Sequence, residues 1–390
     1  MSHVMNTYAR LPISLVKGEG VWVWDDADNK YLDALAGIAV NGLGHCHPQL
    51  VKAITEQVKT LIHVSNIYHI PQQEKLADLI CEISGMDQVF FANSGAEANE
   101  AAIKLARLYG HKKGLHDSKI IVMEKSFHGR TLATLSATGN AKVQKGFEPV
   151  VSGFLRAEYG NLEAIRTLAR QYNNISAILV EPVQGEGGIH LMPASYLQGL
   201  RQICDENDWL LMLDEVQCGI GRTGTWFAFQ HAGILPDVMS LAKGLGSGVP
   251  IGASVVAGKA TNLFQPGNHG STFGGNPLVC AAGLATIQTM QEEKLLENAV
   301  KMGSLIQAQL SAALKGVEGV MDIRGQGLMI GVELVKPCGE LVKLALAKGL
   351  LINVTADKVI RLVPPLIIQA HEVTMLVEKL SELICQFLKN

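Results

Sequence analysis

The sequence predicts an α/β fold in which a mostly parallel central sheet is sandwiched by helices, together with a smaller α+β domain. Between residues 89 and 256, short apolar runs of the kind found in buried strands alternate with helical segments. Strands separated by helices are joined by right-handed crossovers, which makes neighbouring strands parallel. The predicted strands are Val89–Ala92, Lys119–Met123, Ala177–Glu181, Trp209–Asp214, Val238–Ala242 and Ala253–Val256.

Changes of pattern on either side of this region predict three structural units. Residues 1–45 form an arm that joins the small domain, residues 46–295 form the large domain, and residues 296–390 form the C-terminal α+β domain. Helical periodicity marks the start of the large domain at Gln49–His63 and Gln72–Ile83. The strands expected in the C-terminal domain lie near Val320–Ile323, Leu328–Leu334 and Val359–Leu362, between helices.

The composition excludes several classes of function. The 390 residues are 48% hydrophobic and 18% charged, against roughly 25% charged in an average domain, so the chain has a large interior or buries surface in an oligomer. A net charge of −3 without a basic cluster speaks against nucleic-acid binding. We expect no membrane span and no signal peptide. Seven scattered cysteines without a Cys-x-x-Cys motif are typical of reduced thiols, which predicts a cytoplasmic protein.

Asp214 and Lys243 carry the clearest chemistry. Each follows an apolar run, and glycines come directly after Lys243. Neighbouring parallel strands would aim both side chains into the crevice where open α/β sheets bind ligands. Pyridoxal phosphate needs such a pair, a lysine for the Schiff base and a carboxylate that keeps the pyridine nitrogen protonated. The alternative is a capping carboxylate and a solvated lysine.

A phosphate site is predicted where the strand ending at Ala92 meets a helix. Ser94 is a natural cap with Glu97 three residues on, and residues 98–109 are strongly helix-forming. Gly95 and Ala96 would then present free N–H groups at a positive helix terminus, which binds an anion without a basic side chain. A plain capping box is the alternative.

A second candidate for phosphate binding is the segment Gly270–Pro277. Its hydroxyls, on Ser271 and Thr272, stand among glycines that would permit close approach to a phosphate. The alternative is a flexible loop before the helix expected near Pro277.

Two other motifs are weaker. Residues 219–224 read Gly-Ile-Gly-Arg-Thr-Gly, but a dinucleotide fingerprint should lie between a strand and a helix start, and here neither is adjacent. His45-Cys46-His47 could suggest a metal, yet no second ligand pair stands at zinc-like spacing and Pro48 is a typical helix start. We interpret it as a structural turn and predict no metal.

With these residues in hand, the chain resembles the class III aminotransferases that depend on pyridoxal phosphate, over nearly its whole length. Three motifs carry the resemblance: Gly-His-Cys-His-Pro (44–48), Phe-His-Gly-Arg-Thr (127–131) and Glu-Pro-Val-Gln-Gly-Glu-Gly-Gly (181–188). Within the class it is most similar to the acetylornithine aminotransferases, above all in residues 31–45. The resemblance implies fold type I of the pyridoxal phosphate enzymes and a homodimer with its active site at the subunit interface.

The resemblance also implies how the cofactor is bound. Lys243 would form the Schiff base and move the substrate proton, and Asp214 would pair with the pyridinium nitrogen. The remaining cofactor contacts are implied for Ser94, Gly95 and Ala96 at the phosphate, Phe127 and Val216 on the two ring faces, Glu215, Gln217 at the phenolic oxygen, and Thr272 reaching the phosphate from the partner subunit.

Substrate recognition is implied for two arginines. Arg130 resembles the residue that binds the carboxylate remote from the reacting amine, with Ser271 beside it, and Arg361 the one that binds the α-carboxylate of glutamate or 2-oxoglutarate. Glu186 resembles the carboxylate that covers Arg361 in one half-reaction and swings aside in the other. Tyr8 aligns with a tyrosine that touches the substrate carboxylate in ornithine aminotransferases.

These roles imply a ping-pong transamination in arginine biosynthesis. N2-acetylornithine would give its terminal amine and leave as N-acetylglutamate 5-semialdehyde, and 2-oxoglutarate would take the amine and leave as glutamate. Succinylornithine, ornithine and 4-aminobutyrate aminotransferases are alternatives, and a non-catalytic relative that binds pyridoxal phosphate is a remote one. Ile38 speaks against free ornithine, because ornithine aminotransferases carry an aromatic residue near this position.

Overall fold

The centre of the molecule is a seven-stranded sheet with strand order β4-β12-β11-β10-β7-β5-β6. The computed structural model describes residues 3–389. The strands are β4 (Gln88–Ala92), β5 (Lys119–Met123), β6 (Phe154–Ala157), β7 (Ile175–Val180), β10 (Leu210–Asp214), β11 (Val238–Leu241) and β12 (Gly252–Val256). Only β12 runs against its neighbours β11 and β4, so the prediction of a mostly parallel sheet is confirmed.

The sequence prediction missed one strand of this sheet, β6. It is a short edge strand that pairs with β5 alone, and only its last residue, Ala157, is buried. Arg156 lies within it and donates to the carbonyl of Ser136 at 2.8 Å. A four-residue segment with a central arginine has no continuous apolar run, which is why the pattern of buried strands did not reveal it.

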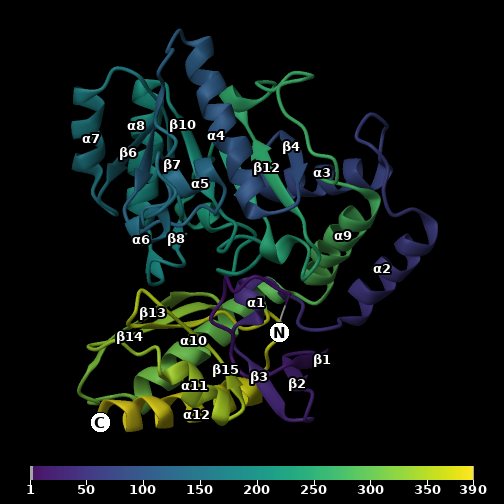
Figure 1. Ribbon diagram of the computed structural model, residues 1–390, viewed down its shortest axis with the longest axis vertical. Coiled ribbons are helices and arrows are strands. Elements are labelled where there is room, and N and C mark those ends of the chain that lie inside the picture. Colours follow the sequence, from purple (N-terminus) through teal and green to yellow (C-terminus); the bar gives the residue numbers. More distant parts are fainter. Residues whose placement is uncertain (1–2, 390) are drawn as a thin grey trace.

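Helices cover both faces of the sheet, as predicted. Alternate residues of each strand point to opposite faces, so β5 sends Ile120 and Val122 to one cluster and Ile121 and Met123 to the other. The helix α4 (Gly95–Lys112) packs on the first face, and α8 (Ala194–Asn207) on the second (Figure 1). The other helices of this large body are α2 (Pro48–Thr60), α3 (Pro71–Ser84), α5 (Leu132–Ala137), α6 (Ala141–Gln144), α7 (Leu162–Gln171) and α9 (Pro277–Glu292).

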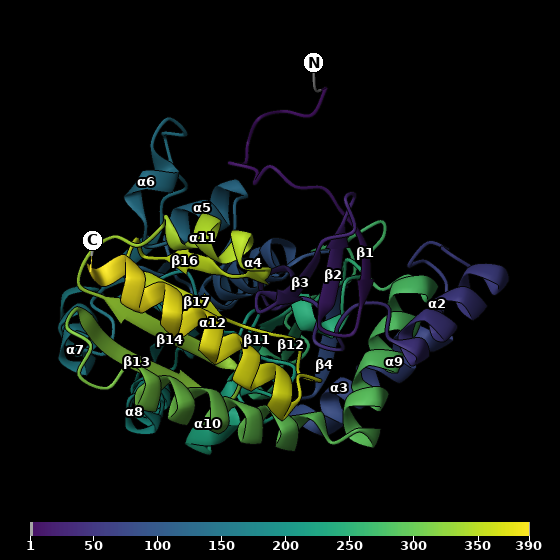
Figure 2. The same cartoon turned by 90° about the horizontal axis from the view of Figure 1, so that it is seen from below.

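A small body lies below the large one in Figure 1. Its antiparallel sheet has the order β13-β14-β17-β16, built from β13 (Val320–Gln326), β14 (Met329–Leu334), β16 (Asn353–Thr355) and β17 (Val359–Leu362). Seen from below in Figure 2, α10 (Leu295–Ala313) and α12 (Ala370–Lys389) run side by side. The shorter helix α11 (Leu341–Ala347) completes this part.

The N-terminal segment shares a sheet with the C-terminal part of the chain. The strands β1 (Leu15–Glu19), β2 (Trp22–Asp25) and β3 (Lys30–Asp33) form a meander, and β3 pairs in parallel with β15 (Leu350–Leu351). The predicted boundaries at residues 45 and 295 stay predictions. Within residues 3–389, no helix is both long and apolar enough to span a membrane.

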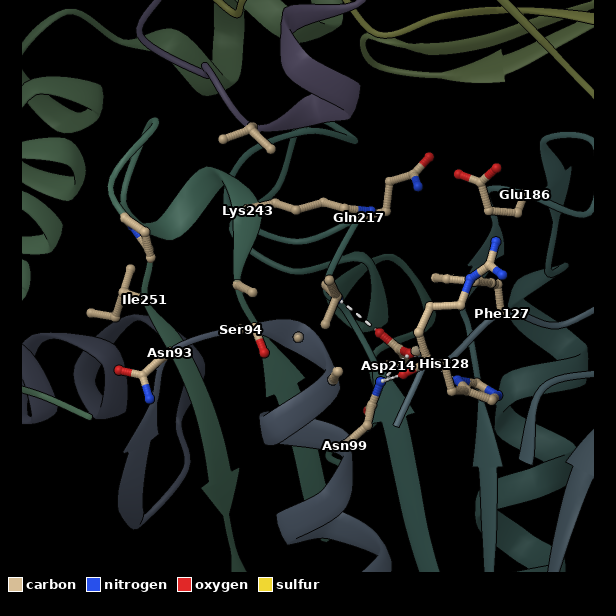
Figure 3. A pocket seen from close by; sticks show the side chains of 18 of the residues that line it. Asn93, Ser94, Asn99, Phe127, His128, Glu186, Asp214, Gln217, Lys243 and Ile251 are labelled. Atoms are coloured by element: carbon tan, nitrogen blue, oxygen red, sulfur yellow. Dashed lines mark hydrogen bonds and ion pairs between the residues drawn. The ribbon is translucent and has the colours of Figure 1, made fainter. Parts of the chain in front are cut away.

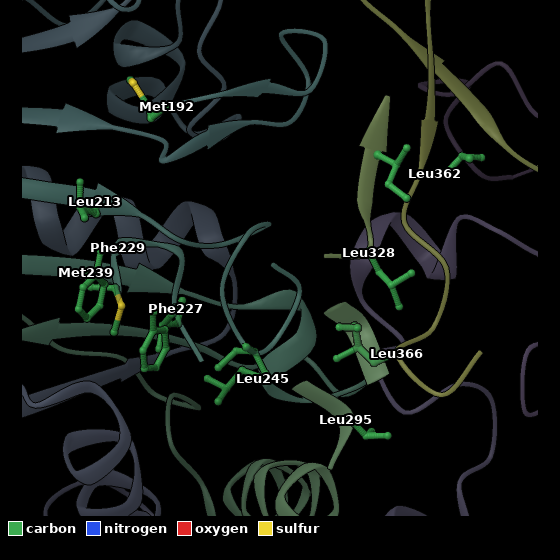
Figure 4. Packing of buried hydrophobic residues seen from close by; sticks show 14 of the residues in the cluster. Met192, Leu213, Phe227, Phe229, Met239, Leu245, Leu295, Leu328, Leu362 and Leu366 are labelled. Carbon is green, nitrogen blue, oxygen red and sulfur yellow. The ribbon is translucent and has the colours of Figure 1, made fainter. Parts of the chain in front are cut away.

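One continuous hydrophobic cluster joins the two bodies. Figure 4 shows its members between them, with Leu213 and Met239 on the sheet side and Leu328 and Leu362 on the side of the small body. Because the apolar cluster is shared, the two bodies hold a defined position relative to each other, which matters for a site lying where they meet.

The segment Gly219–Gly224 contributes to the same junction and resembles no dinucleotide site. It forms a turn rather than the start of a helix. Its Arg222 is buried and donates to the carbonyl oxygens of Leu328 at 3.1 Å and Pro364 at 2.5 Å, both in the C-terminal part of the chain. Its glycines permit close packing, because a Cβ on Gly221 would lie 2.4 Å from Met290 and one on Gly224 would lie 2.4 Å from Val300.

The segment around His45 and His47 is a turn before α2, which begins at Pro48 as expected. His45 Nε2 lies 2.8 Å from a carboxylate oxygen of Asp33, and His47 Nε2 lies 3.1 Å from Glu293. Each histidine thus pairs with a different carboxylate.

Arg222 provides a test of the junction. We expect Arg222→Met to lower the free energy of unfolding by about 2–4 kcal/mol, because the two buried carbonyls lose their donor. Denaturant unfolding measures this difference, with Arg170→Met on exposed α7 as the control, where the change should be below about 1 kcal/mol. Equal small effects of both substitutions would show that the Arg222 bonds do not hold the bodies together.

Candidate active site

The site is built around Asp214, the last residue of β10. Its Oδ2 accepts hydrogen bonds from Asn99 Nδ2 at 2.7 Å and lies 2.8 Å from His128 Nδ1, and its Oδ1 accepts from the N–H of Val216 at 3.1 Å. Asp214 and His128 are both buried. A carboxylate held in one orientation by three partners suits a fixed ionic contact with a protonated ring nitrogen.

Lys243 follows the neighbouring strand, as the sequence predicted. The strands β10 and β11 are parallel, with Asp214 opposite Ser240, so both functional residues leave the same edge of the sheet. Lys243 has a φ of 44°, a left-handed conformation that costs a non-glycine residue on the order of 1 kcal/mol and is concentrated at functional sites. Burial lowers the pKa of the Lys243 ammonium, and Arg361 adds to this while Glu186 opposes it.

The predicted phosphate turn is also formed. Ser94 caps α4, and its hydroxyl oxygen accepts from the N–H of Glu97 at 3.2 Å. The Glu97 carboxylate accepts instead from the backbone and side chain of Asn93, both at 2.8 Å. Gly95 is required here because a Cβ would lie 2.7 Å from a methyl group of Val216. The first N–H groups of the helix therefore face the cavity without side chains in the way.

These elements enclose a cavity of about 450 Å³. Figure 3 shows Lys243 extending across it toward the side where Gln217 and Glu186 lie, with Asp214, Asn99 and His128 below. Of the predicted site residues, those that line it are Ser94, Gly95, Ala96, Phe127, Arg130, Glu186, Asp214, Val216, Gln217 and Lys243. The structure thus brings together predicted residues from five separate regions of the chain.

Glu215 is not brought to the cavity. Its carboxylate accepts from the N–H groups of Ala228 at 2.9 Å and Phe229 at 2.8 Å, and from the thiol of Cys218 at 3.2 Å. Burial raises the pKa of Glu215 to about 7. Its side chain therefore holds the start of the short 3-10 helix Ala228–Ala232 rather than facing the cavity.

Glu186 lines the cavity and forms an ion pair with Arg361, which is buried behind it and itself lines neither this cavity nor the second one described below. The Arg361 side chain is 0% exposed, and its guanidinium also donates to Gln217 Oε1 and to Asn353 Oδ1, each at 3.1 Å. Among the residues that the structure describes, its Nη2 finds no hydrogen-bond partner. Burial favours the neutral form of Glu186, but the Arg361 guanidinium holds the pKa of Glu186 below its usual value.

A second cavity, of about 910 Å³, adjoins the first and shares Phe127, Arg130, Glu186 and Lys243 with it. Tyr8 and Ile38 also line this second cavity. The guanidinium carbon of Arg130 lies 5.6 Å from the centre of the Phe127 ring. Within residues 3–389, Arg130 makes no ion pair, so its charge is available to a bound carboxylate.

The remaining two predicted residues, Ser271 and Thr272, line neither cavity. Ser271 Oγ accepts from Asn93 Nδ2 at 3.1 Å, which places it behind the phosphate turn. Thr272 is exposed and lines neither cavity of its own chain. Asn99 and His128 are functional neighbours that the sequence reasoning did not assign. His128 stands in the motif Phe-His-Gly-Arg-Thr, and Asn99 lies in the capped helix α4. The signal available for Asn99 was a polar residue on the buried face of that helix.

Glu181 is a further residue that was not assigned a role. It follows β7 and lies in the cavity wall, where its carboxylate accepts from the N–H groups of Phe127 at 2.8 Å and Gly185 at 3.2 Å. Burial raises the pKa of Glu181 to about 7, while His128 lowers it and Asp214 raises it.

Comparison with known proteins decides the family. The family model described as aminotransferase class III matches residues 4–384. The chain belongs to the class III aminotransferases. This enzyme family uses pyridoxal phosphate, which agrees with the pairing of a lysine and an aspartate at the sheet edge.

Curated relatives of this class III aminotransferase match it over full length. It is 60% identical to the acetylornithine aminotransferase of Nitrosomonas europaea, covering 100% of this chain and 99% of the relative. It is 56% identical to acetylornithine aminotransferase 1 of Bordetella bronchiseptica, covering 99% and 98%.

Solved structures confirm fold type I. The ornithine aminotransferase from Toxoplasma gondii has a TM-score of 0.95 at 32% identity, covering 99% of this chain and 93% of that one. The acetylornithine aminotransferase from Elizabethkingia anophelis has a TM-score of 0.87 at 34% identity, covering 99% and 97%.

Glu181 generates a prediction about pH. The folded aminotransferase keeps the Glu181 proton up to a pH of about 7, whereas the unfolded chain releases it near the ordinary value of 4.5. Folding therefore takes up a proton in this window, and the contribution of this group to the free energy of unfolding falls as pH rises. Glu181→Gln mimics the protonated form. The free energy of unfolding of the wild type minus that of this variant should fall by about 1–3 kcal/mol between pH 5 and pH 7, as measured by denaturant unfolding.

The matched control is Glu163→Gln on exposed α7. Its hydrogen bond with Arg170 lowers the pKa of Glu163, so its own contribution changes only below about pH 4.5 and should be constant from pH 5 to 7. Parallel pH curves for the wild type and Glu181→Gln would contradict the raised pKa.

Proposed function

We propose that this class III aminotransferase transfers the terminal amine of N2-acetylornithine to 2-oxoglutarate, with pyridoxal phosphate as cofactor. The ion pair that buried Arg361 makes with Glu186, a residue that lines both cavities together with Lys243 and Arg130, is the observation that carries the proposal. Glu186 neutralises Arg361, whereas Arg130 makes no ion pair within residues 3–389. This arrangement suits two substrates that carry different charged groups near the same reacting atom. The curated relatives named acetylornithine aminotransferase support the choice of substrate.

The residues around the cavity fit the cofactor. Asp214 would hold the protonated pyridine nitrogen, and the free N–H groups of Gly95 and Ala96 would hold the phosphate. Phe127 and Val216 would flank the ring, and Gln217 would bind its phenolic oxygen. A solved relative, the ornithine aminotransferase from Toxoplasma gondii, is described with partial occupancy of pyridoxal phosphate at its active site.

Bound pyridoxal phosphate supplies an electron sink that stabilises negative charge on the substrate carbon next to the transferred nitrogen. Lys243 supplies the proton chemistry at that carbon. Because burial lowers the pKa of its amine, a larger fraction of Lys243 is neutral and able to accept a proton near neutral pH. Asp214 keeps the ring nitrogen charged through its fixed carboxylate.

The two arginines divide the work between the substrates. In the first half-reaction Arg130 would bind the α-carboxylate of N2-acetylornithine at the cavity mouth, while Glu186 neutralises Arg361 beside the methylene chain. In the second, the α-carboxylate of 2-oxoglutarate would take the place of Glu186 on Arg361 through two parallel hydrogen bonds. Leaving a buried guanidinium without a partner costs several kcal/mol, roughly, so Arg361 needs one of these carboxylates at every stage.

Ornithine is the alternative substrate that the solved structures suggest, since several are ornithine aminotransferases. Ile38 lines the second cavity and offers only apolar surface to an α-amino group. An acyl group on that nitrogen removes its charge, which suits an apolar wall better than a free ammonium does. The size of the second cavity also leaves succinylornithine as an alternative.

We also propose a homodimer. The exposed apolar residues Ile67, Tyr68 and Phe273 lie on two segments that Asn66 ties together by donating to the carbonyls of Ser271 and Gly274, both at 3.0 Å. Exposed apolar patches of this kind mark protein interfaces. Thr272 stands on the same patch, where it could reach the phosphate of a partner subunit.

The proposed reaction belongs to arginine biosynthesis in the cytoplasm. All seven cysteines are free thiols, and four of them are buried, which suits a reducing compartment.

The substrate is tested by half-reactions without a keto acid. The purified holoenzyme is mixed separately with N2-acetylornithine, ornithine, succinylornithine and 4-aminobutyrate, and the absorbance of the cofactor is followed. We expect fast loss of the yellow colour with N2-acetylornithine and slow or no loss with ornithine and 4-aminobutyrate. Equal rates with N2-acetylornithine and succinylornithine would not decide between these two substrates. If only glutamate reacts, the substrate assignment is wrong.

Lys243→Ala tests the proton transfer. Because it removes the only base assigned to the substrate carbon, we expect the rate of amine transfer to fall by at least about 10²–10⁴-fold while the variant still binds pyridoxal phosphate. Single-turnover kinetics and cofactor fluorescence measure the two effects. The exposed Lys343→Ala on α11 is the control, and turnover of Lys243→Ala at the control rate would remove Lys243 from the mechanism.

A further inference from the structure

The short strand β16 carries two polar side chains that reach the ion pair from the small body. Asn353 and Thr355 are two residues apart, so they lie on the same face of the strand. Asn353 stands directly opposite Arg361 in the antiparallel pairing of β16 with β17. The strand therefore has a fixed register relative to the buried guanidinium.

Each of these side chains holds one half of the ion pair. Asn353 Oδ1 accepts a hydrogen bond from Arg361 Nε at 3.1 Å, and the hydroxyl of Thr355 donates to the backbone carbonyl of Glu186. Thr355 is buried and lines the second cavity. Neither bond uses the Glu186 carboxylate or Arg361 Nη1, the groups that form the ion pair itself.

The backbone on either side of Glu186 is held as well. The N–H of Gly185 donates to Glu181 at 3.2 Å, and Arg324 of β13 donates to the carbonyls of Gly188 at 2.6 Å and Ile189 at 2.9 Å. Because these hydrogen bonds hold its neighbours and its own carbonyl, we expect Glu186 to leave Arg361 by rotation of its side chain. The position of its Cα relative to Arg361 then decides how well the carboxylate covers the guanidinium.

We propose that Asn353 and Thr355 are positioning residues that set the balance between the two substrates of the transamination. Thr355 fixes the distance from which Glu186 covers Arg361, and Asn353 fixes the plane of the guanidinium that must meet a substrate carboxylate. The inference rests on the proposed use of Arg361 by alternating carboxylates. It adds a strand of the small body as the element that determines specificity.

The two residues should act in opposite directions. Thr355→Val keeps the shape but removes the donor to Glu186, so the cover of Arg361 weakens and the half-reaction with the terminal amine slows. Asn353→Ala removes the hydrogen bond that orients the plane of the Arg361 guanidinium. Recognition of glutamate and 2-oxoglutarate through two parallel hydrogen bonds depends on this plane. The ion pair with Glu186, which uses Nη1 alone, depends on it less. The loss of one such bond corresponds to a change of about 3- to 10-fold.

The experiment measures kcat/KM of both half-reactions in the holoenzyme, with N2-acetylornithine and with glutamate, and takes their ratio. We expect the ratio of acetylornithine to glutamate to fall about 3- to 10-fold in Thr355→Val and to rise by a similar factor in Asn353→Ala. Thr355→Ser keeps the hydroxyl and should restore the wild-type ratio. Melting temperatures show whether each variant is folded.

A merely structural role would lower both half-reactions by the same factor and leave the ratio unchanged, and this result would overturn the proposal. If Thr355→Val does not fold, the ratio in Asn353→Ala decides alone. Failure of the proposed function looks different, since the wild type itself would then not react with N2-acetylornithine. In that case the ratio is measured with whichever terminal amine among ornithine, succinylornithine and 4-aminobutyrate reacts.

Discussion

The need to keep a buried guanidinium paired is the constraint on which the rest of the site depends. Arg361 has no solvent exposure, so its charge is stabilised only by groups that the fold brings to it. Gln217 and Asn353 satisfy part of its hydrogen bonding, but neither is charged. Glu186 supplies the charge. In the proposed mechanism this neutralises Arg361 while the methylene chain of N2-acetylornithine lies beside it.

The sheet edge provides the other fixed point. Parallel pairing of β10 with β11 puts Asp214 and Lys243 on the same side, and the left-handed backbone at Lys243 turns the chain where the strand has ended. The cost of that conformation is small compared with the shared hydrophobic cluster beneath it. Rigid strands thus hold Asp214 and Lys243, while Glu186 is the side chain that we propose adapts to the substrate.

Much of this arrangement could be predicted from the sequence, because apolar runs and glycine turns are local signals. They gave the strands that end at Ala92 and Asp214 and the capped start of α4. Family resemblance supplied Glu186 and Arg361, whose pairing no local pattern reveals since they are 175 residues apart. What could not be predicted depends on tertiary contacts between side chains of ordinary type.

Asn353 and Thr355 illustrate this limit. In the sequence they belong to a three-residue strand of mixed polarity, and nothing there distinguishes them from a solvated edge. Their contacts with Arg361 and Glu186 arise from the pairing of β16 with β17 and from the approach of residues 185–189 of the large body. Glu215 shows the opposite case. It follows Asp214 in the sequence and was expected in the site, yet its carboxylate accepts hydrogen bonds from the N–H groups of Ala228 and Phe229.

The ion pair also joins the two bodies of the molecule, since Glu186 comes from the large body and Arg361 from the small one. Arg222 and Arg324 make further bonds across the same junction, from opposite sides. A small shift between the bodies would therefore change the distance from Glu186 to Arg361 directly. In the proposed mechanism, selectivity between the two substrates therefore depends on close packing of the junction, because the two partners of the ion pair come from different bodies.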